Sequence, residues 1–415
     1  MRAIFLVLLI VACTLPACEQ QRSPTQPTAP TTATDTIATA WPATLPSPPP
    51  DTVDGSRTHL GYQTEHDTAF FIGQQRYRLL LRAETDSTKP LTTVSEGVVG
   101  EAFADDTSTF VQTRLVRGYE GGPVIMLLDA AGRQVFRRRL RKQDFFGVAS
   151  RDIATVSEPQ CPRFTGYHAP SQVLALALNI GIPYSDVAQQ CVILLGIDGR
   201  VRRLATSYLS NWEASDCEPR LLPDGTVLTC QELLPPVGKP ISLLKPKSQL
   251  VAAFPLTDST LFTAYRYGEY RTEAATASDS KPNVSAEFAA PEWVADPRKR
   301  NAPNAFILSR QGQILQAFRY AGYGGVIGYE VPRRYVWQTH TYYLLDEQRG
   351  VQLLDKHHPK AVTEVTFQQM QRFQKPQRPA EIRFAIVTET AAFALYVDPA
   401  QPTRLRYEKI KEKVE

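Results

Sequence analysis

The sequence predicts an all-β protein, and three observations support this prediction. Short apolar runs repeatedly lead into a turn with Asp or Gly, and a second run then alternates apolar with charged residues. The chain of 415 residues holds 32 Pro, 17 Tyr and 18 Phe but only 3 Met, which suits strands and turns better than helices. Its hydrophobic fraction of 43% is sufficient for a sizeable core.

The clearest hairpin is predicted at Cys191–Leu204. An apolar run, Val192–Leu195, leads into a turn at Asp198-Gly199, where glycine tolerates a positive φ without a steric penalty. The return limb alternates Val201 and Leu204 with arginines. We therefore expect one buried limb and one half-exposed limb.

Related strands and hairpins are predicted along the rest of the chain. In order, they are 68–82, 124–140, 172–180, 220–230, 250–271, 305–318, 341–354 and 393–406. Their spacing is irregular, so the sequence contains no strict repeat. A four-stranded propeller blade takes about 40–50 residues, and residues 59–407 are long enough for about six or seven blades.

At the level of architecture, this series of hairpins resembles the irregular β-propellers of bacteria, although no Trp-Asp dipeptide marks a blade. Two β-sandwich domains are the alternative, because they would show the same hairpins and turns. Residues 273–304 are polar and predict a surface insertion, while residues 366–373 predict a short helix. Residues 408–415 are predicted to form a charged tail.

Residues 1–17 are predicted to be a signal peptide. Ala3–Ala12 is an uninterrupted apolar run, shorter than the roughly 20 residues that span a bilayer but typical of a secretory signal. The segment that follows, Leu15-Pro16-Ala17-Cys18, resembles the bacterial lipobox, in which a small residue precedes the cysteine that receives lipid. Pro16 departs from that pattern, and the alternative is an ordinary signal peptide in which Cys18 is incidental.

Residues 18–58 are predicted to be a disordered tether between the lipid and a folded body. Residues 19–58 hold 8 Pro and 10 Thr, with Trp41 and Leu45 as their main large apolar residues. Such a segment cannot bury a core. The two N-terminal segments together predict a lipoprotein of the outer membrane, facing either the periplasm or the cell surface.

Four cysteines follow the N-terminal segments, and an even number in an exported chain predicts two disulfides. Cys217 and Cys230 flank the turn at 223–225 almost symmetrically, so we expect them to bridge the two limbs of one hairpin. Cys161 and Cys191 would then form the second pair. A zinc site is the alternative, although the sequence contains no CxxC pair.

Aromatic residues beside several glycines form the most distinctive candidate binding site. Tyr320, Tyr323, Tyr329 and Trp337, with His340 among them, offer ring faces for a sugar or a peptide and polar groups to orient it. The alternative is that these side chains pack one sheet against the next.

No catalytic residue is predicted, because the sequence contains neither a GxSxG nor an HExxH motif. We also expect no cofactor or metal. A net charge of +4, spread along the chain, does not indicate nucleic-acid binding. Basic runs such as Arg137–Arg139 are interpreted as solvated strand edges, with lipid phosphates as the alternative partner.

The sequence thus favours a lipid-anchored cell-envelope protein with a non-catalytic binding or scaffolding role. Its partner would be an envelope protein or a glycan. The alternative is an exported glycan hydrolase or lyase on the same scaffold, since scattered carboxylates need not form a linear motif. A purely structural envelope component is a third hypothesis.

The lipid anchor is tested by changing Cys18 to Ser. The variant should move from the membrane fraction to the soluble fraction, because the acyl chains would have no thiol to attach to. Immunoblots of the two fractions check this expectation. If the variant stayed in the membrane fraction, Cys18 would not be the anchor.

Overall fold

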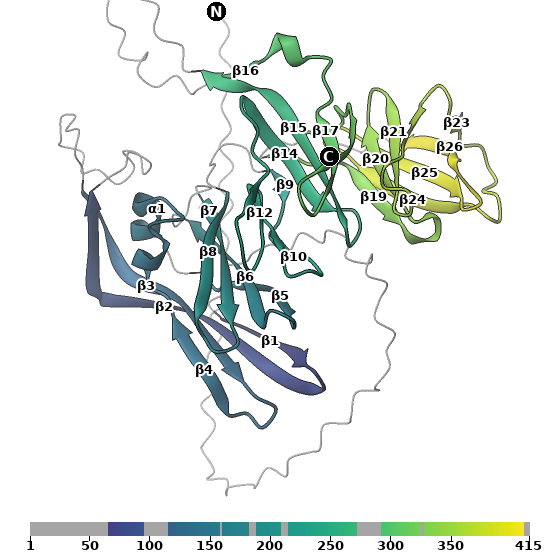
Figure 1. Ribbon diagram of the computed structural model, residues 1–415. Helices are drawn as coiled ribbons and strands as arrows, with labels where there is room; N and C mark the ends of the chain where they lie inside the picture. Colours follow the sequence, from purple (N-terminus) through teal and green to yellow (C-terminus); the bar gives the residue numbers. More distant parts are fainter. Residues whose placement is uncertain are drawn as a thin grey trace, which may run out of the picture. The chain divides into compact units, whose positions relative to one another are not determined.

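The computed structural model describes residues 65–94, 115–157, 160–181, 188–208, 215–271, 292–324 and 328–410 (Figure 1). The predicted signal peptide, the tether and Cys18 lie outside these residues, as do 411–415 of the predicted tail. The prediction of an all-β fold is confirmed, because the described residues form six sheets with predominantly antiparallel pairing. They contain no helix long and apolar enough to cross a membrane.

The first three sheets follow one another along the chain. The first contains, in order, β1 (Glu65–Ile72), β2 (Gln75–Val94), β3 (Leu115–Leu128) and β4 (Gln134–Arg139). The second contains β5 (Arg163–His168), β6 (Val173–Gly181), β7 (Ala188–Gly196) and β8 (Val201–Tyr208). The third contains β10 (Arg220–Leu221), β11 (Val227–Leu228), β12 (Glu232–Leu234) and β13 (Ile241–Ser242). Helix α1 (Arg151–Val156) and the 3₁₀ turn η3 (Lys142–Phe145) lie between the first two sheets in sequence.

The last three sheets continue this order, except that β9 of the fourth sheet precedes the third sheet in sequence. The fourth is β18 (Ile314–Phe318), β17 (Ala305–Ser309), β15 (Thr260–Arg271), β14 (Ser248–Pro255) and β9 (Asp216–Cys217), with β16 (Glu292–Ala295) also on β15. The fifth is β19 (Arg333–Val336), β20 (Thr341–Asp346), β21 (Gly350–Asp355) and β22 (Val362–Thr366). The sixth is β23 (Gln371–Arg372), β26 (Gln401–Ile410), β25 (Ala392–Asp398) and β24 (Ile382–Val387).

The predicted hairpins are confirmed, and their turns follow the expected chemistry. Between β7 and β8, Gly199 has a φ of +77°, and the Asp198 carboxylate accepts a hydrogen bond from the backbone N–H of Arg200 at 3.0 Å. The aspartate thus closes the turn that the glycine makes possible. The hairpins β3–β4 and β10–β11 also turn through a glycine of positive φ, at Gly132 and Gly225.

Successive sheets pack face to face through shared apolar clusters. Along β6, Leu174 and Leu176 face the cluster between the first and second sheets, whereas Val173 and Ala175 face the cluster between the second and third. Alternate side chains on a strand point to opposite faces, so β6 is buried on both sides and reads as a continuous apolar run. Further clusters join the third sheet to the fourth, the fourth to the fifth and the fifth to the sixth. Whether these sheets act as blades around one axis stays a prediction.

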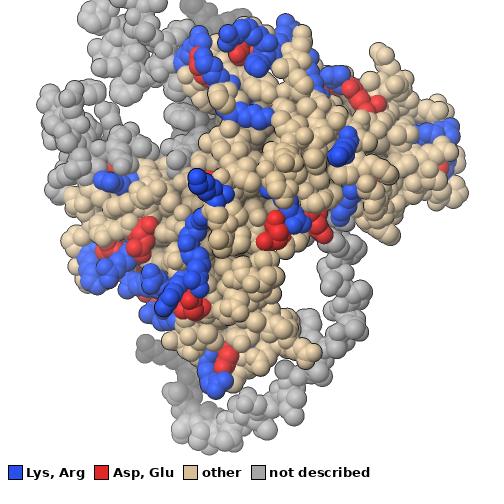
Figure 2. Space-filling view, viewed as in Figure 1, with Lys and Arg blue, Asp and Glu red and all other residues tan. Residues whose placement is uncertain are grey.

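Several ion pairs lie on the outer face of the first sheet. Asp67 pairs with Arg82 at 2.6 Å and with Arg78 at 3.5 Å, and Glu84 pairs with Arg137 at 3.1 Å. Figure 2 shows most groups of Lys and Arg on the visible face with Asp or Glu beside them. Arg137 and Arg139, which both pair with Glu84, therefore belong to a charge-balanced, solvated face, which supports the interpretation as a strand edge.

The outer face of the sixth sheet is covered by the chain that follows β23. Phe373 stacks on Tyr396 at 3.9 Å between ring centroids. The buried guanidinium of Arg406 donates hydrogen bonds to both carboxylate oxygens of Glu381 and holds the pKa of Glu381 below its usual value. Two predictions are corrected here: residues 366–373 form a turn and β23 instead of a helix, and Glu408–Ile410 belong to β26 instead of the tail.

The predicted insertion at 273–304 is also partly corrected. Residues 273–291 lie outside the described residues, but β16 pairs with β15 in an antiparallel register. Asn304 is buried, and its amide donates hydrogen bonds to the carbonyls of Tyr265 and Tyr320 at 2.9 and 2.8 Å. The end of this segment is thus built into the core, because a buried amide needs partners for its polar atoms.

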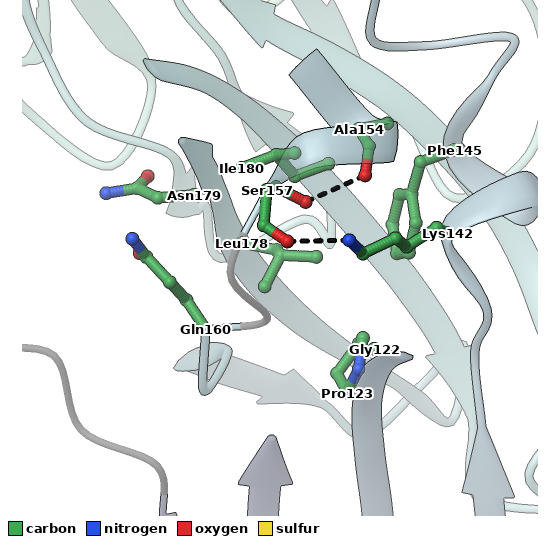
Figure 3. Close-up of a pocket in the computed structure, with 10 residues that line it drawn as sticks. All are labelled: Gly122, Pro123, Lys142, Phe145, Ala154, Ser157, Gln160, Leu178, Asn179 and Ile180. Atoms are coloured by element: carbon green, nitrogen blue, oxygen red, sulfur yellow. Dashed lines mark hydrogen bonds between the residues drawn. The ribbon is translucent and has the colours of Figure 1, made fainter. Parts of the chain in front are cut away.

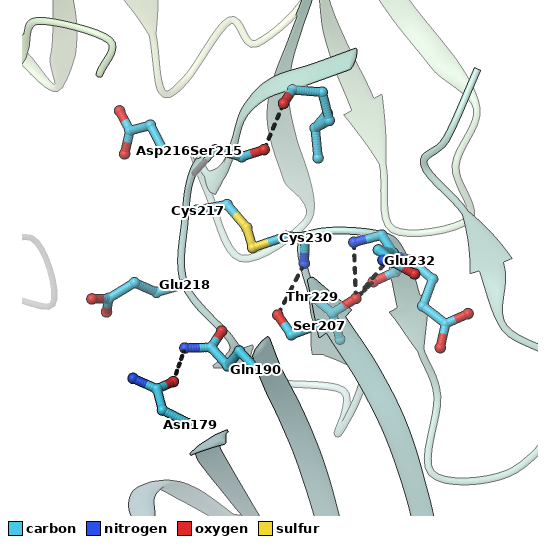
Figure 4. The surroundings of a disulfide bond; sticks show 12 residues. Asn179, Gln190, Ser207, Ser215, Asp216, Cys217, Glu218, Thr229, Cys230 and Glu232 are labelled. Atoms are coloured by element: carbon cyan, nitrogen blue, oxygen red, sulfur yellow. Dashed lines mark hydrogen bonds between the residues drawn. A yellow bond between two sulfur atoms is a disulfide. The ribbon is translucent and has the colours of Figure 1, made fainter. Parts of the chain in front are cut away.

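The disulfide Cys217–Cys230 is confirmed, with a Cα–Cα distance of 5.7 Å (Figure 4). Its structural role differs from the expectation, because β9 does not pair with β10. Cys217 lies opposite Ala253 of β14 in a parallel pair, so the bridge joins the fourth sheet to the turn after β11 in the third. Two residues upstream of Cys217, the Ser215 hydroxyl donates to the Leu250 carbonyl at 2.5 Å.

The predicted second disulfide, Cys161–Cys191, is not formed. Both cysteines contribute to the cluster between the first two sheets and are free thiols. The Cys191 thiol donates to the carbonyl of Val148, and the Cys161 thiol donates to the carbonyl of Pro162. Burial raises the pKa of Cys161 to about 11 and that of Cys191 to about 12, so both thiols stay protonated and unreactive.

We expect the unreduced, unfolded mature protein to show one linked pair, Cys217–Cys230, and alkylation of Cys161 and Cys191. Peptide mass spectrometry checks this assignment. Replacing both Cys217 and Cys230 with Ser should lower the free energy of unfolding by about 3 kcal/mol, because the unfolded chain loses a closed loop. A Cys161–Cys191 peptide, or unchanged stability of the double variant, would contradict the assignment.

Candidate functional site

The predicted aromatic group does not form one site. Tyr320 is 1% exposed in the core between the fourth and fifth sheets. Its hydroxyl donates to the Leu345 carbonyl at 2.8 Å, its ring packs edge-on against Phe262, and burial raises its pKa well above the usual value. Tyr320 therefore belongs to the core instead of a binding surface.

Tyr323 and Tyr329 pack edge to face, with 5.8 Å between ring centroids. The Tyr329 ring lies 4.9 Å from the guanidinium carbon of Arg266, which is also 3.8 Å from the Trp293 ring. This cation–π arrangement holds β16 against β15. Sequence reasoning missed Arg266 and Trp293, since they come from strands far along the chain from the tyrosines.

Trp337 and His340 lie at the β19–β20 connection. Trp337 is 56% exposed in the 3₁₀ turn η6 (Trp337–Thr339). The His340 ring packs against the His357 ring at 4.5 Å, while His358 Nδ1 lies 2.9 Å from the Asp355 carboxylate. Within the ranges that the structure describes, no group of three or more His, Cys, Asp and Glu residues is arranged to hold a metal ion.

A small pocket lies beside Lys142, between β3, β6 and α1 (Figure 3). Its free volume is about 20 Å³, enough for about one water molecule. Lys142 Nζ donates to the carbonyls of Thr155 and Ser157 at 2.8 and 2.6 Å, and burial lowers the pKa of Lys142 to about 8. This lysine caps the C-terminal end of α1, which is a structural role.

The larger hollow lies at the edge of the sixth sheet, and we call it the C-terminal cavity. Its volume is about 480 Å³, within the range of about 300–1,000 Å³ that is usual for ligand pockets. Four aromatic residues line it: Phe367, Phe373, Phe393 and Tyr407. Four charged residues complete the lining: Glu347, Arg372, Glu408 and Lys409.

Three rings form the apolar wall of the C-terminal cavity. Phe367 stacks on Phe393 at 5.6 Å between centroids and contacts Tyr407 at 4.9 Å. Phe393 is 3% exposed, whereas Phe367 and Tyr407 are half-buried. The buried ring thus supports two half-buried rings.

Local strand geometry explains why the hollow exists. β23 pairs with β26 only through Gln371↔Arg406 and Arg372↔Tyr407, and the Phe373 N–H then bonds to the Tyr407 carbonyl at 2.8 Å. Beyond Tyr407, β26 has no further residue of β23 beside it. The chain after β22 and the turn after β20 supply the remaining wall through Phe367 and Glu347.

The carboxylates of the C-terminal cavity are held in different ways. Glu347 accepts a hydrogen bond from Thr390 at 2.6 Å. Burial alone would raise the pKa of Glu347, but hydrogen bonds from Thr388 and Thr390 and the charge of Lys409 lower it. Glu408 instead lies 3.5 Å from the Tyr396 hydroxyl. Since Tyr407 and Glu408 are consecutive on β26, their side chains leave on opposite faces.

Comparisons with known proteins give no identity. No family model matches the chain, and no curated protein matches it. The structure is similar to a crystal structure of a eukaryotic initiation factor, at 10% identity over 84% of this chain and 88% of the other, with a TM-score of 0.30. An acylaminoacyl peptidase from Pyrococcus horikoshii shares 10% identity over 85% of this chain and 46% of its own, with a TM-score of 0.20. Neither similarity is close enough to establish a shared fold or function.

The structural role of Lys142 predicts a pH dependence of stability. Because its folded pKa is lowered from 10.5 to about 8, the unfolded chain binds the proton more tightly. The free energy of unfolding of the wild type, relative to Lys142→Met, should therefore rise between these two pH values by about 3 kcal/mol. Urea unfolding of both proteins across this range checks the expectation, which parallel pH profiles would contradict.

Proposed function

We propose that this protein is a lipid-anchored component of the bacterial cell envelope with a non-catalytic binding or scaffolding role. The lipobox-like segment ending at Cys18 and the Pro/Thr-rich tether support the anchor in the outer membrane. The observation that carries a binding role is the C-terminal cavity, where half-buried rings lie beside charged side chains. The partner is an envelope protein or a glycan, on the periplasmic side or at the cell surface.

An exported glycan hydrolase or lyase is the second candidate, because two carboxylates, Glu347 and Glu408, line the same cavity. A glycosidase acid needs a raised pKa so that it carries a proton near neutral pH. The pKa of Glu347 is lowered, so this residue is ionised and suits an acceptor of hydrogen bonds. Glu408 leaves β26 on the face opposite Tyr407, which separates the two carboxylates. Binding is therefore favoured over hydrolysis.

In-cell photo-crosslinking tests the binding role. A photoreactive amino acid replaces Gln368, which is exposed and adjacent to Phe367. We expect a discrete adduct in the membrane fraction, because a bound partner would lie beside this position. The matched control is Arg383, which is exposed on β24 of the same sheet and does not line the cavity.

Equal adducts at Gln368 and Arg383, or none at either position, would contradict a binding role for the C-terminal cavity. Release of sugar from envelope glycans by the purified protein, lost in Glu347→Gln, would favour the hydrolase instead.

A further inference from the structure

The accessible side of the C-terminal cavity combines a ring surface with three charged groups. Tyr407 and Lys409 are two residues apart on β26 and therefore share a face, and Arg372 lies opposite Tyr407 in the β23–β26 pair. The Lys409 ammonium lies 5.4 Å from the centroid of Phe393. This places a guanidinium and an ammonium on the same side as the aromatic wall.

Glu347 supplies the complementary acceptor. Its Oε2 accepts a hydrogen bond from Thr390, and Lys409 acts on it electrostatically. An ionised carboxylate accepts hydrogen bonds at both oxygens, while Arg and Lys only donate. The cavity thus presents donors and an acceptor around the half-buried rings of Phe367 and Tyr407.

The charges of the lining disfavour a wholly apolar ligand. On the accessible side, the charge of Lys409 is offset by that of Glu347, while Arg372 adds one guanidinium donor. A wholly apolar ligand would leave these charged groups desolvated without partners. A neutral molecule with an apolar face and several hydroxyl groups satisfies both the rings and the charges, because each hydroxyl both donates and accepts.

We infer that the C-terminal cavity binds a neutral sugar, which packs against the tilted rings of Phe367 and Tyr407 and hydrogen-bonds through its hydroxyls to Glu347, Arg372 and Lys409. The inference rests on the proposed binding function and names its ligand class. The volume of about 480 Å³ leaves room for more than one sugar unit, so a short oligosaccharide is the expected occupant.

Calorimetric titration of the mature protein with maltotriose, cellotriose and N,N′,N″-triacetylchitotriose tests the inference. We expect at least one of these neutral trisaccharides to bind more tightly than trigalacturonate, which carries carboxylates. In the variants Arg372→Ala and Glu347→Gln, affinity should fall about tenfold or more, because each loses a charge-assisted hydrogen bond. Tyr407→Leu should weaken binding while keeping apolar volume in the wall.

The matched control is Arg383→Ala, which removes a guanidinium from the same sheet outside the cavity and should leave affinity unchanged. Thermal unfolding of every variant separates lost binding from lost folding. Absence of binding by all three neutral sugars at about 10 mM would overturn the inference, since any specific complex of at least mM affinity would be detected. Loss of affinity in Trp337→Ala without loss in Arg372→Ala would also overturn it.

The two proposals fail in different ways. If the neutral sugars do not bind but Gln368 crosslinks a protein in cells, the sugar inference is wrong and the binding role stands. If trigalacturonate binds best, the cavity selects anions and the inference of a neutral sugar is wrong. If neither a sugar nor a crosslinked partner is found, both proposals fail.

Discussion

Two consecutive residues, Asp216 and Cys217, connect three successive sheets. Cys217 is covalently linked to Cys230 in the third sheet, and both residues pair with β14 in the fourth. Asp216 accepts hydrogen bonds from the backbone N–H of Val331, at 2.8 Å, and from the guanidinium of Arg333, which leads the fifth sheet. The short, mostly antiparallel sheets bury their apolar faces against their neighbours, so links of this kind fix the order of packing.

The local part of this architecture could be predicted from the sequence. An apolar run, an Asp-Gly turn and an alternating run depend on contacts within one hairpin, as at Asp198 and Gly199. The pairing of Cys217 with Cys230 was predicted from their symmetry around a turn, although the bridge joins two sheets instead of two limbs of one hairpin. The sequence could not reveal that β9 pairs with β14, because a two-residue strand has no periodicity. The prediction that Tyr320 lies in a binding site was wrong for a related reason, since the burial of its ring depends on residues of neighbouring sheets.

No sequence motif indicates the C-terminal cavity, because its lining depends on how separate sheets pack. Its lining extends from Glu347 to Lys409 and comes from the fifth and sixth sheets. The hollow forms because β23 covers so little of β26, while the Arg406–Glu381 pair holds the covering chain on the opposite face. We therefore place the binding site where the regular packing of sheets ends. There, the rings of Phe367 and Tyr407 remain half-buried instead of packing fully against a neighbouring strand.

Hydrogen exchange by mass spectrometry, with and without a neutral trisaccharide, tests the central claim that this cavity is the binding site. We predict slower exchange in peptides covering 366–373 and 405–410, where bound sugar would shield the backbone and restrain the cavity walls. Peptides covering 320–340 should be unaffected. Protection confined to 320–340, or no protection in the walls of the cavity, would contradict the account.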